Sequence, residues 1–406
     1  MNKTITRLAA ASLVLFGVEH AQTQGGRSLG PSAGVPSDPA TPRRPLGILL
    51  PLPWMPGSDL LSEWTFWWQV NKDYYWAFDL FPPPGPLAPL LHGLLGSDRS
   101  WRWRRPLRPT REQLGNIVTP ALRRVLEEAS DRDIVSACLI ALAKIRLAGD
   151  LSAILGKYMA SRDPEISETA LLALGIAGLE EALPDLLEIF KSTDRGADLV
   201  GDPFLVSRRK RALAGYALGL IGHASKKNEM KRAVYEAAKE VLEATGRLAA
   251  QDVPVAALHA IRLLGPDPAG PEGASLILEA SGYLLDYLED ERNGPRVRAH
   301  VPAALSTLIG RYLVPRFRAI GSRDPADGFE ESAEALRTEA IRRFGRMARD
   351  RGEHPLLVQS CILALGRMAA SDDAGVLEVL DQMASGKLTS EIQARRFAML
   401  SLGCLG

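Results

Sequence analysis

The chain has 406 residues, of which 46% are hydrophobic and 24% are charged, and its formal net charge is +1. This composition excludes a wholly disordered chain, and the small net charge excludes a global field that draws the protein to nucleic acid or membrane. The length exceeds that of one compact core, so we expect several domains or one repetitive array.

The first 21 residues have the pattern of an export signal. Lys3 and Arg7 precede an apolar run over residues 8–18, which is too short to span a bilayer. Ala21 suits the last position of a signal peptide, whereas Glu19 occupies a position where a small residue is preferred. We therefore expect an exported protein that is periplasmic, envelope-associated or secreted, with an uncleaved anchor as the alternative.

A linker and an aromatic segment follow the signal. Residues 22–56 are rich in Gly, Pro and Ser, and this composition predicts a flexible, disordered linker. All seven tryptophans lie between residues 54 and 103, and we expect residues 57–115 to form a helical cap at the N-terminal end of the domain that follows.

Two groups of tryptophans within this segment are candidates for docking or for packing. Trp64, Trp67 and Trp68 lie on one side of a predicted helix, and Trp101 and Trp103 alternate with arginines. Such aromatic side chains dock on a partner or, in the simpler interpretation that we favour, pack on the first helical repeat while the arginines stay solvated.

A repeated motif of small and aliphatic residues fills residues 116–406. Four of the intervals between the glycines of successive copies are 37 to 45 residues long, which is the period of a helix-pair repeat. The copies include Ala173–Gly178, Ala217–Gly222, Ala260–Gly265, Ser306–Gly310, Ala364–Ala369 and Ser401–Gly406. Small residues three or four apart let two helices approach closely, and no single pair can bury both of its faces. We therefore predict an all-α fold, an α-solenoid of stacked helix pairs.

Two resemblances agree with this prediction. Asp163, Pro164, Ala170, the Ala173–Gly178 motif and Pro184 make the repeat resemble the short bacterial HEAT repeat of the phycobilin-lyase-like subtype. The segment from Trp64 to Tyr75, followed by an Arg-Pro-Thr stretch and alanine-rich repeats, resembles the beginning of exported HEAT-repeat proteins of planctomycete-like bacteria. These resemblances imply architecture and export, not a particular activity.

The repeat pattern predicts seven helix pairs. Their second helices are expected near residues 133–148, 165–178, 205–222, 252–265, 295–312, 354–370 and 389–406. The last pair ends with the apolar residues Phe397, Met399, Leu400, Leu402 and Leu405 and has no polar capping helix behind it, so we expect either a longer chain or a partner at that end.

No motif of the chain indicates catalysis. The iron-dependent enzymes on HEAT scaffolds need paired His-Glu dipeptides, and this sequence has none; its six histidines are scattered along the chain. The three cysteines, Cys138, Cys361 and Cys404, lie too far apart in sequence for a zinc site, and we expect each to be a buried small residue. We expect neither a metal nor a cofactor.

Charge placement provides the binding hypothesis. In HEAT solenoids the second helices line the concave face, and the expected second helices carry 13 Lys or Arg against 5 Asp or Glu. The candidate basic face comprises Arg208, Arg209, Arg211, Arg262, Arg298 and Arg367. These side chains form a groove for an acidic or extended protein segment, or they point sideways into salt bridges between repeats and into water.

The sequence therefore predicts a non-catalytic protein–protein interaction scaffold in the periplasm or envelope. A module that binds polyanions or nucleic acid is the second interpretation, and a lyase-like enzyme on a HEAT scaffold is the third. The polyanion interpretation predicts steep salt dependence with little sequence preference.

Overall fold

The computed structural model describes residues 109–244, 251–310, 325–370 and 373–405. The expected signal peptide, the linker and the aromatic segment as far as residue 108 lie outside these residues, as do all seven tryptophans. The chain divides into two units at the boundary between Arg108 and Pro109, and the following description concerns the second unit.

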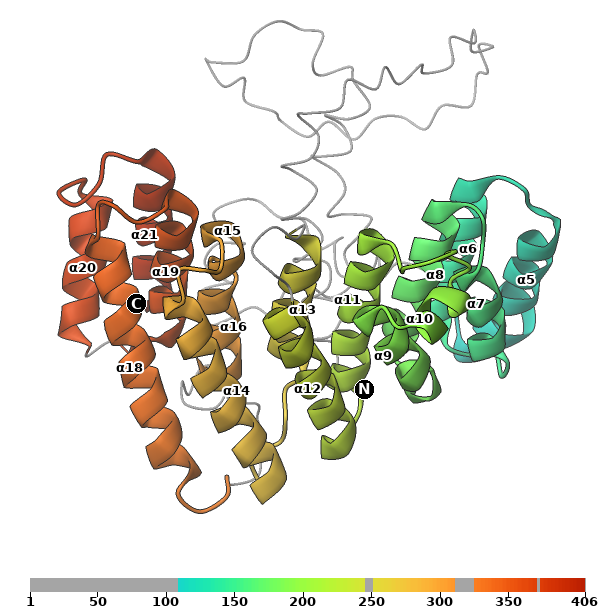
Figure 1. Ribbon diagram of the computed structural model, residues 1–406, viewed down its shortest axis with the longest axis horizontal. Helices are drawn as coiled ribbons and strands as arrows, with labels where there is room; N and C mark the ends of the chain where they lie inside the picture. Colours follow the sequence, from blue (N-terminus) through green and yellow to red (C-terminus); the bar gives the residue numbers. More distant parts are fainter. Residues whose placement is uncertain (1–108, 245–250, 311–324, 371–372, 406) are drawn as a thin grey trace, which may run out of the picture. The chain divides into compact units, whose positions relative to one another are not determined.

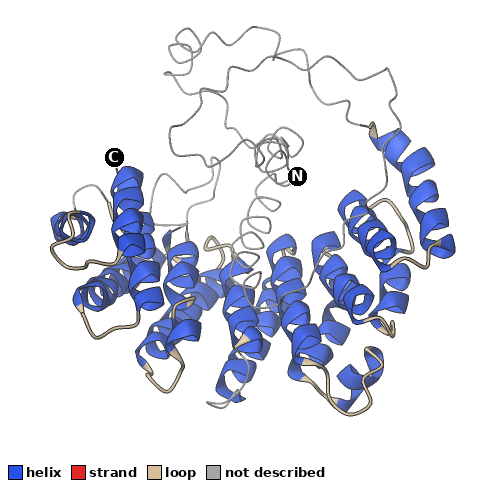
Figure 2. Ribbon diagram, turned by 90° about the horizontal axis from the view of Figure 1, so that it is seen from above, coloured by secondary structure: helices blue, strands red, loops and turns tan. Residues whose placement is uncertain are grey.

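The described part of the second unit is all-helical and contains no strand (Figure 2). It begins with short helical segments, α4 (Arg111–Gln113) and the π-helical η3 (Leu114–Val118). Thr110 is the N-cap of α4 and forms a capping box with Gln113, in which each side chain accepts a hydrogen bond from the backbone N–H of the other residue. Among the described helices, none combines the length and apolar composition that crossing a bilayer requires.

The helices of the unit pack in pairs, in which a first helix contacts the second helix that follows it along the chain. The first helices of these pairs are α5 (Thr119–Glu128), α7 (Leu151–Met159), α9 (Leu183–Lys191), α12 (Asn228–Ala244), α14 (Pro271–Glu289), α18 (Phe329–Arg349) and α20 (Ala374–Ala384). The second helices are α6 (Arg132–Ile145), α8 (Pro164–Ala177), α11 (Arg208–Ala224), α13 (Asp252–Leu263), α16 (Val301–Leu308), α19 (Pro355–Met368) and α21 (Ile392–Leu405). Short segments η4 (Glu180–Ala182), α10 (Asp194–Leu199) and α15 (Pro295–Arg298) lie between them. Six of the seven expected second helices coincide with single observed helices, and the one expected near residues 295–312 is divided into α15 and α16.

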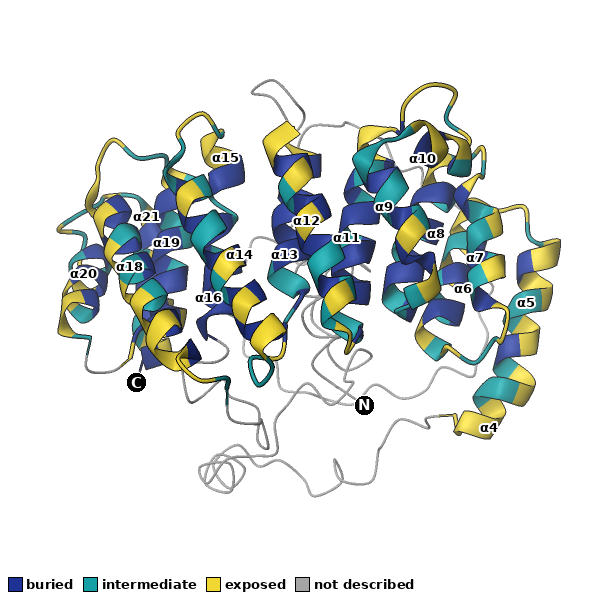
Figure 3. Ribbon diagram, turned by 60° about the horizontal axis from the view of Figure 1, so that its bottom comes forward, coloured by how far each residue is buried: buried dark blue, intermediate teal, exposed yellow. Residues whose placement is uncertain are grey.

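The second helices form a continuous series in which each packs against the next (Figure 1). A glycine of α8 faces Ala217 of α11, and Gly215 and Gly219 of α11 face Ala256 and Ala260 of α13. The contacts move from Gly215 to Gly219 along α11 and, in the same direction, from Ala256 to Ala260 along α13. These two helices therefore run parallel. One hydrophobic cluster extends from Leu126 to Leu405, so the pairs share a continuous core (Figure 3).

Local signals explain where several helices begin and end. Asp131 caps α6 and Asp163 caps α8, and each carboxylate accepts two backbone N–H groups of the first turn. Gly178 ends α8 with a φ of +66°, a conformation that glycine adopts without steric cost. Gly222 behaves differently, since α11 continues through it to Ala224. The helix expected near residues 205–222 therefore ends two residues later, and Gly222 packs closely against Leu264.

Candidate binding surfaces

The six arginines of the expected basic face lie in different environments. Arg208, Arg209 and Arg367 are exposed, Arg211 and Arg262 are half-buried, and Arg298 is buried. Arg208 is in the first turn of α11, whereas Arg262 is in the last turn of α13. Since α11 and α13 run parallel and Arg262 lies about level with Ile221, the two arginines are separated by about 20 Å along the helix axes. They do not form one patch.

Arg298 does not belong to a basic surface, and its assignment there was wrong. Its Nε donates a hydrogen bond of 2.7 Å to the carbonyl of Leu288, and its guanidinium lies 3.7 Å from the Glu353 carboxylate. A buried charge persists only where it is paired and hydrogen-bonded. Arg298 therefore ties the end of α14 to the connection before α19.

Arg211 and Arg262 also connect helices. The Nε of Arg211 donates to the carbonyl of Phe190 at the end of α9, over 3.0 Å, and burial lowers the pKa of this guanidinium. The Nε of Arg262 donates to the Thr307 hydroxyl of α16 over 3.1 Å. These two side chains thus form hydrogen bonds to neighbouring helices, whereas the sideways alternative had named salt bridges and water.

A buried lysine holds the backbone of the connection between α10 and α11 (residues 200–207) in place. Lys210 donates from Nζ to the carbonyl of Val200 (3.0 Å) and to the carboxylate of Asp202 (2.7 Å). Asp202 in turn accepts the backbone N–H of Ser207 at 2.8 Å. Because the Lys210–Asp202 ion pair links both ends of the connection, contacts within the protein determine the shape of the connection.

Two apolar side chains project from this fixed connection. Phe204 is 84% exposed and Leu205 is 70% exposed, while the next residue, Val206, is buried and donates its N–H to the Ser192 hydroxyl. Burying a side chain of this size is worth about 1.5–3 kcal/mol, so exposing two adjacent ones is costly. Adjacent exposed apolar residues on an ordered connection indicate an interaction site.

Two exposed arginines follow these apolar residues at the start of α11. Arg209 lies 2.9 Å from the Glu168 carboxylate, which is itself buried and whose pKa is raised by desolvation. The side chain of Arg209 is 76% exposed despite this pair. Arg208 has no ion-pair partner among the described residues. We call Phe204, Leu205, Arg208 and Arg209 the α11 tip.

The structure also brings together residues that seemed scattered in the sequence. The ring centroids of Tyr216 (α11) and His259 (α13) are 5.4 Å apart, and those of His259 and His300, which precedes α16, are also 5.4 Å apart. Burial, followed by the neighbouring His300 and Arg262, lowers the pKa of His259 to about 3. Burial and the positive charge of Arg262 lower the pKa of His300 to about 4. We call these three aromatic residues the Tyr-His row. The three residues are spaced in the sequence at intervals close to the repeat period. This spacing could have predicted that they lie together, and the sequence analysis missed it.

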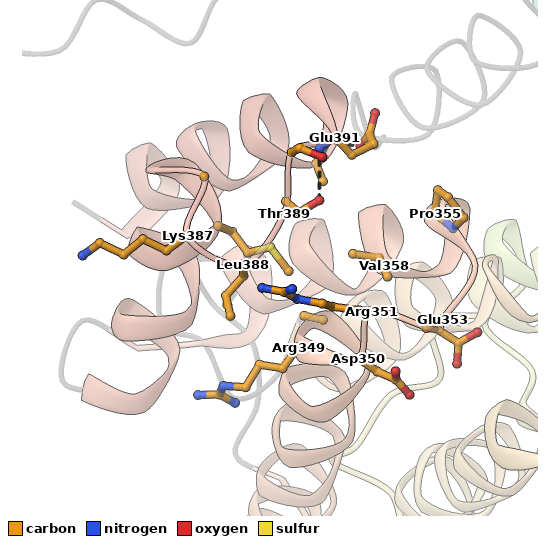
Figure 4. Close-up of a pocket in the computed structure, with 15 residues that line it drawn as sticks. Arg349, Asp350, Arg351, Glu353, Pro355, Val358, Lys387, Leu388, Thr389 and Glu391 are labelled. Atoms are coloured by element: carbon orange, nitrogen blue, oxygen red, sulfur yellow. Dashed lines mark hydrogen bonds between the residues drawn. The ribbon is translucent and has the colours of Figure 1, made fainter.

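A cavity of about 440 Å³ lies between the α18–α19 and α20–α21 connections (Figure 4). Two carboxylates that line the cavity accept hydrogen bonds from backbone N–H groups. Glu391 accepts from Gln393 and Ala394, and Glu353 accepts from His354. These acceptors cap the beginning of α21 and the turn before α19. The cavity therefore offers occupied carboxylates rather than a free acid–base pair.

The cysteines divide into two classes. Cys138 and Cys361 are buried, and burial raises the pKa of both thiols. Cys404 is exposed, so the expectation that it is buried was wrong. Within the described ranges, no group of three or more His, Cys, Asp or Glu side chains has the geometry to hold a metal ion.

The aromatic candidates Trp64, Trp67, Trp68, Trp101 and Trp103 lie outside the described residues, and their docking and packing alternatives remain predictions. No protein-family model matches the chain, and a search among curated proteins finds no match.

Proposed function

We propose that the chain is a non-catalytic protein–protein interaction scaffold in the periplasm or envelope, built as an α-solenoid of HEAT-type helix pairs. The architecture is supported by the continuous series of second helices, of which α11 and α13 run parallel with small residues at their crossing. The motif resemblance supports the repeat type, and the apolar run over residues 8–18 supports export.

The observation that carries the proposal is the α11 tip. A connection fixed by the Lys210–Asp202 pair exposes Phe204 and Leu205 directly beside Arg208 and Arg209. Aromatic and aliphatic side chains supply affinity by leaving water, and adjacent arginines select a partner of opposite charge. The expected partner is a protein whose acidic segment also carries an apolar residue that covers the tip.

The test is a nuclease-treated pull-down from the native envelope fraction, with the full chain as bait and quantitative mass spectrometry as the readout. We compare the wild-type chain with a Phe204→Ser/Leu205→Ser variant and an Arg208→Glu/Arg209→Glu variant. Arg351→Glu is the matched control, because Arg351 is an exposed arginine far along the chain from the tip.

The proposal expects at least one protein that the wild type and the Arg351→Glu control recover equally and that both tip variants lose by tenfold or more. Equal recovery by all four chains removes the tip from the interaction. Binding that survives only without nuclease replaces the protein partner with a polyanion.

A further inference from the structure

In four helix pairs, a side chain near the start of the following helix donates a hydrogen bond to a carbonyl at the end of the first helix. The donors and acceptors are Ser167 to Met159, Arg211 to Phe190, Arg298 to Leu288 and Arg395 to Ala384. The carbonyls of the last turn of a helix have no partner within that helix, so these side chains supply a bond that the backbone cannot.

The connection that follows α18 matches the connection that follows α14 residue by residue. Asp290 and Asp350 follow the two helices, and each carboxylate accepts the backbone N–H of the residue two positions later. Pro295 and Pro355 begin the next helices at the same distance from these aspartates. The two connections can therefore be compared position by position.

This comparison places Val358 at the position of Arg298, and Ala348 at the position of Leu288. Valine has no hydrogen-bond donor, so the Ala348 carbonyl does not receive from this position the bond that the Leu288 carbonyl receives. Ala348 and Val358 both line the cavity of about 440 Å³ between the α18–α19 and α20–α21 connections (Figure 4). The cavity thus lies where the arginine of the earlier pair is absent.

The charges at the two connections are also reversed. Glu289 and Glu291 lie on either side of the aspartate that follows α14, whereas Arg349 and Arg351 lie on either side of the aspartate that follows α18. Lys387, on the facing connection, lines the cavity together with these two arginines. All three cations are exposed, and none forms an ion pair with a residue that the structure describes. An excess of unpaired positive charge therefore borders the cavity.

The acidic side chains that line the cavity do not neutralise this charge. Asp350 accepts the N–H of Gly352 at 2.8 Å, and Glu353 and Glu391 accept the backbone N–H groups described above. Glu353 also lies 3.7 Å from the guanidinium of Arg298. Each carboxylate is thus held by the fold, and the cations remain available to a ligand.

Apolar side chains form much of the remaining lining. Val358 and Met383 are buried, and Leu388 is half-buried. Figure 4 shows the side chain of Arg351 extending toward Leu388 across this apolar surface. A guanidinium binds a carboxylate through two hydrogen bonds, and apolar side chains gain free energy when an apolar ligand removes them from water. This combination suits an anion that has an apolar body.

We propose that the cavity binds a small monocarboxylate with an apolar body and an N–H group, the chemistry of an N-acylated apolar amino acid. The carboxylate pairs with Arg351, the apolar chain contacts Val358 and Met383, and the N–H donates to the Ala348 carbonyl in place of the absent arginine. The volume of about 440 Å³ lies within the range of small-molecule sites. The ligand is a small molecule and the site is separate from the α11 tip, so the inference does not rest on the proposed scaffold function.

The first experiment titrates the full chain with N-acetyl-leucine and follows the ligand by NMR. The comparison ligand is N-acetyl-leucinamide, which keeps the shape and the N–H but has no charge. For so small a ligand we expect a dissociation constant of about 0.1–1 mM for the acid. The amide should bind at least tenfold more weakly, because it cannot pair with Arg351.

The second experiment repeats the titration with variants of the cavity. Arg351→Gln should weaken binding of the acid at least tenfold, whereas Arg396→Gln, an exposed arginine of α21 that does not line the cavity, should leave it unchanged. Val358→Arg restores the arginine of the earlier pair and should abolish binding by filling the cavity. Val358→Ala keeps the lining apolar and should retain binding within about threefold.

Circular dichroism establishes that each variant keeps the helicity of the wild type; if Val358→Arg does not, Arg351→Gln decides the question alone. The proposal is overturned if N-acetyl-leucine does not bind at concentrations up to about 10 mM, or if the amide binds equally well. Binding that survives Arg351→Gln, or a folded Val358→Arg, also overturns it. Recovery of a protein through the α11 tip does not depend on any of these titrations, so the two proposals fail separately.

Discussion

Gly219 and Gly403 occupy the same place in the repeat motif, yet their surroundings are opposite. Gly219 lies in the middle of the series, where Ala260 and Leu263 of the next helix leave no room for a Cβ atom. Gly403 lies in the last described helix and faces open space. The motif therefore encodes a surface that accepts a neighbouring helix; α13 covers this surface at Gly219, and no described residue covers it at Gly403.

The same contrast between a buried and an exposed environment distinguishes basic residues that lie close together in the sequence. Lys210 is buried and binds Val200 and Asp202, whereas Arg208, two residues earlier, is exposed. In the packed interior a charge holds backbone together, and at the surface it remains available to a partner.

The largest effect should come from filling a crossing. Gly219→Leu forces a side chain into the backbone of Ala260 and should lower the free energy of unfolding by about 3 kcal/mol or more. Gly403→Leu should be neutral or stabilising by up to about 1 kcal/mol, because a Cβ atom added at Gly403 meets nothing within 4 Å and leucine favours helix over glycine. Urea titration followed by circular dichroism provides the comparison, and equal losses at the two sites would contradict it.

Breaking the buried ion pair should have the next largest effect. Lys210→Ala leaves the Val200 carbonyl and the Asp202 carboxylate without their donor, which should cost about 2–3 kcal/mol. Hydrogen exchange at the Ser207 amide should rise, since that amide depends on Asp202. The control is Lys387→Ala, an exposed lysine; an unchanged Ser207 amide in Lys210→Ala would show that the connection does not depend on the pair.

The Tyr-His row should make stability depend on pH. The pKa values of His259 and His300 are lowered to about 3 and about 4 in the folded chain, so the unfolded chain binds more protons below its ordinary histidine pKa of about 6.5. Stability from these two groups is therefore complete above about pH 6.5 and is lost as the pH falls toward the folded values.

The measurement is the unfolding free energy between pH 7 and 4.5 for the wild type and for His259→Gln, which cannot gain this charge. The wild type should lose on the order of 1–2 kcal/mol more than the variant over this interval. Carboxylates titrate in both chains, so the difference isolates the histidine. Parallel curves for the two chains would rule out a buried neutral His259.

The smallest effect should come from the exposed tip. Arg208→Ala should change the free energy of unfolding by less than about 0.5 kcal/mol, because Arg208 makes no ion pair with the described residues. Arg211→Ala, three residues later, should be more destabilising, because Arg211 binds the Phe190 carbonyl. Thermal unfolding of the two variants side by side tests whether the arginines of α11 divide in this way.

The regular spacing of small residues was enough to predict the helices of the second unit. The period of 37 to 45 residues placed most of the second helices, because a glycine or alanine at each crossing is a local requirement that sequence displays directly. The signal, linker and Trp-rich segment are predictions of the same kind that fall outside the described residues.

The binding residues could not be predicted in the same way, because their exposure depends on neighbours far along the chain. Arg298 is bound by Leu288 and Glu353, and Arg211 by Phe190, and no local pattern distinguishes them from the exposed Arg208. Sequence alone determined the helical period and the glycines of the crossings, since these follow from backbone geometry. Only the tertiary structure decided which charges are buried, that His259 meets His300, and that Gly403 faces open space, since each depends on which helix lies beside it.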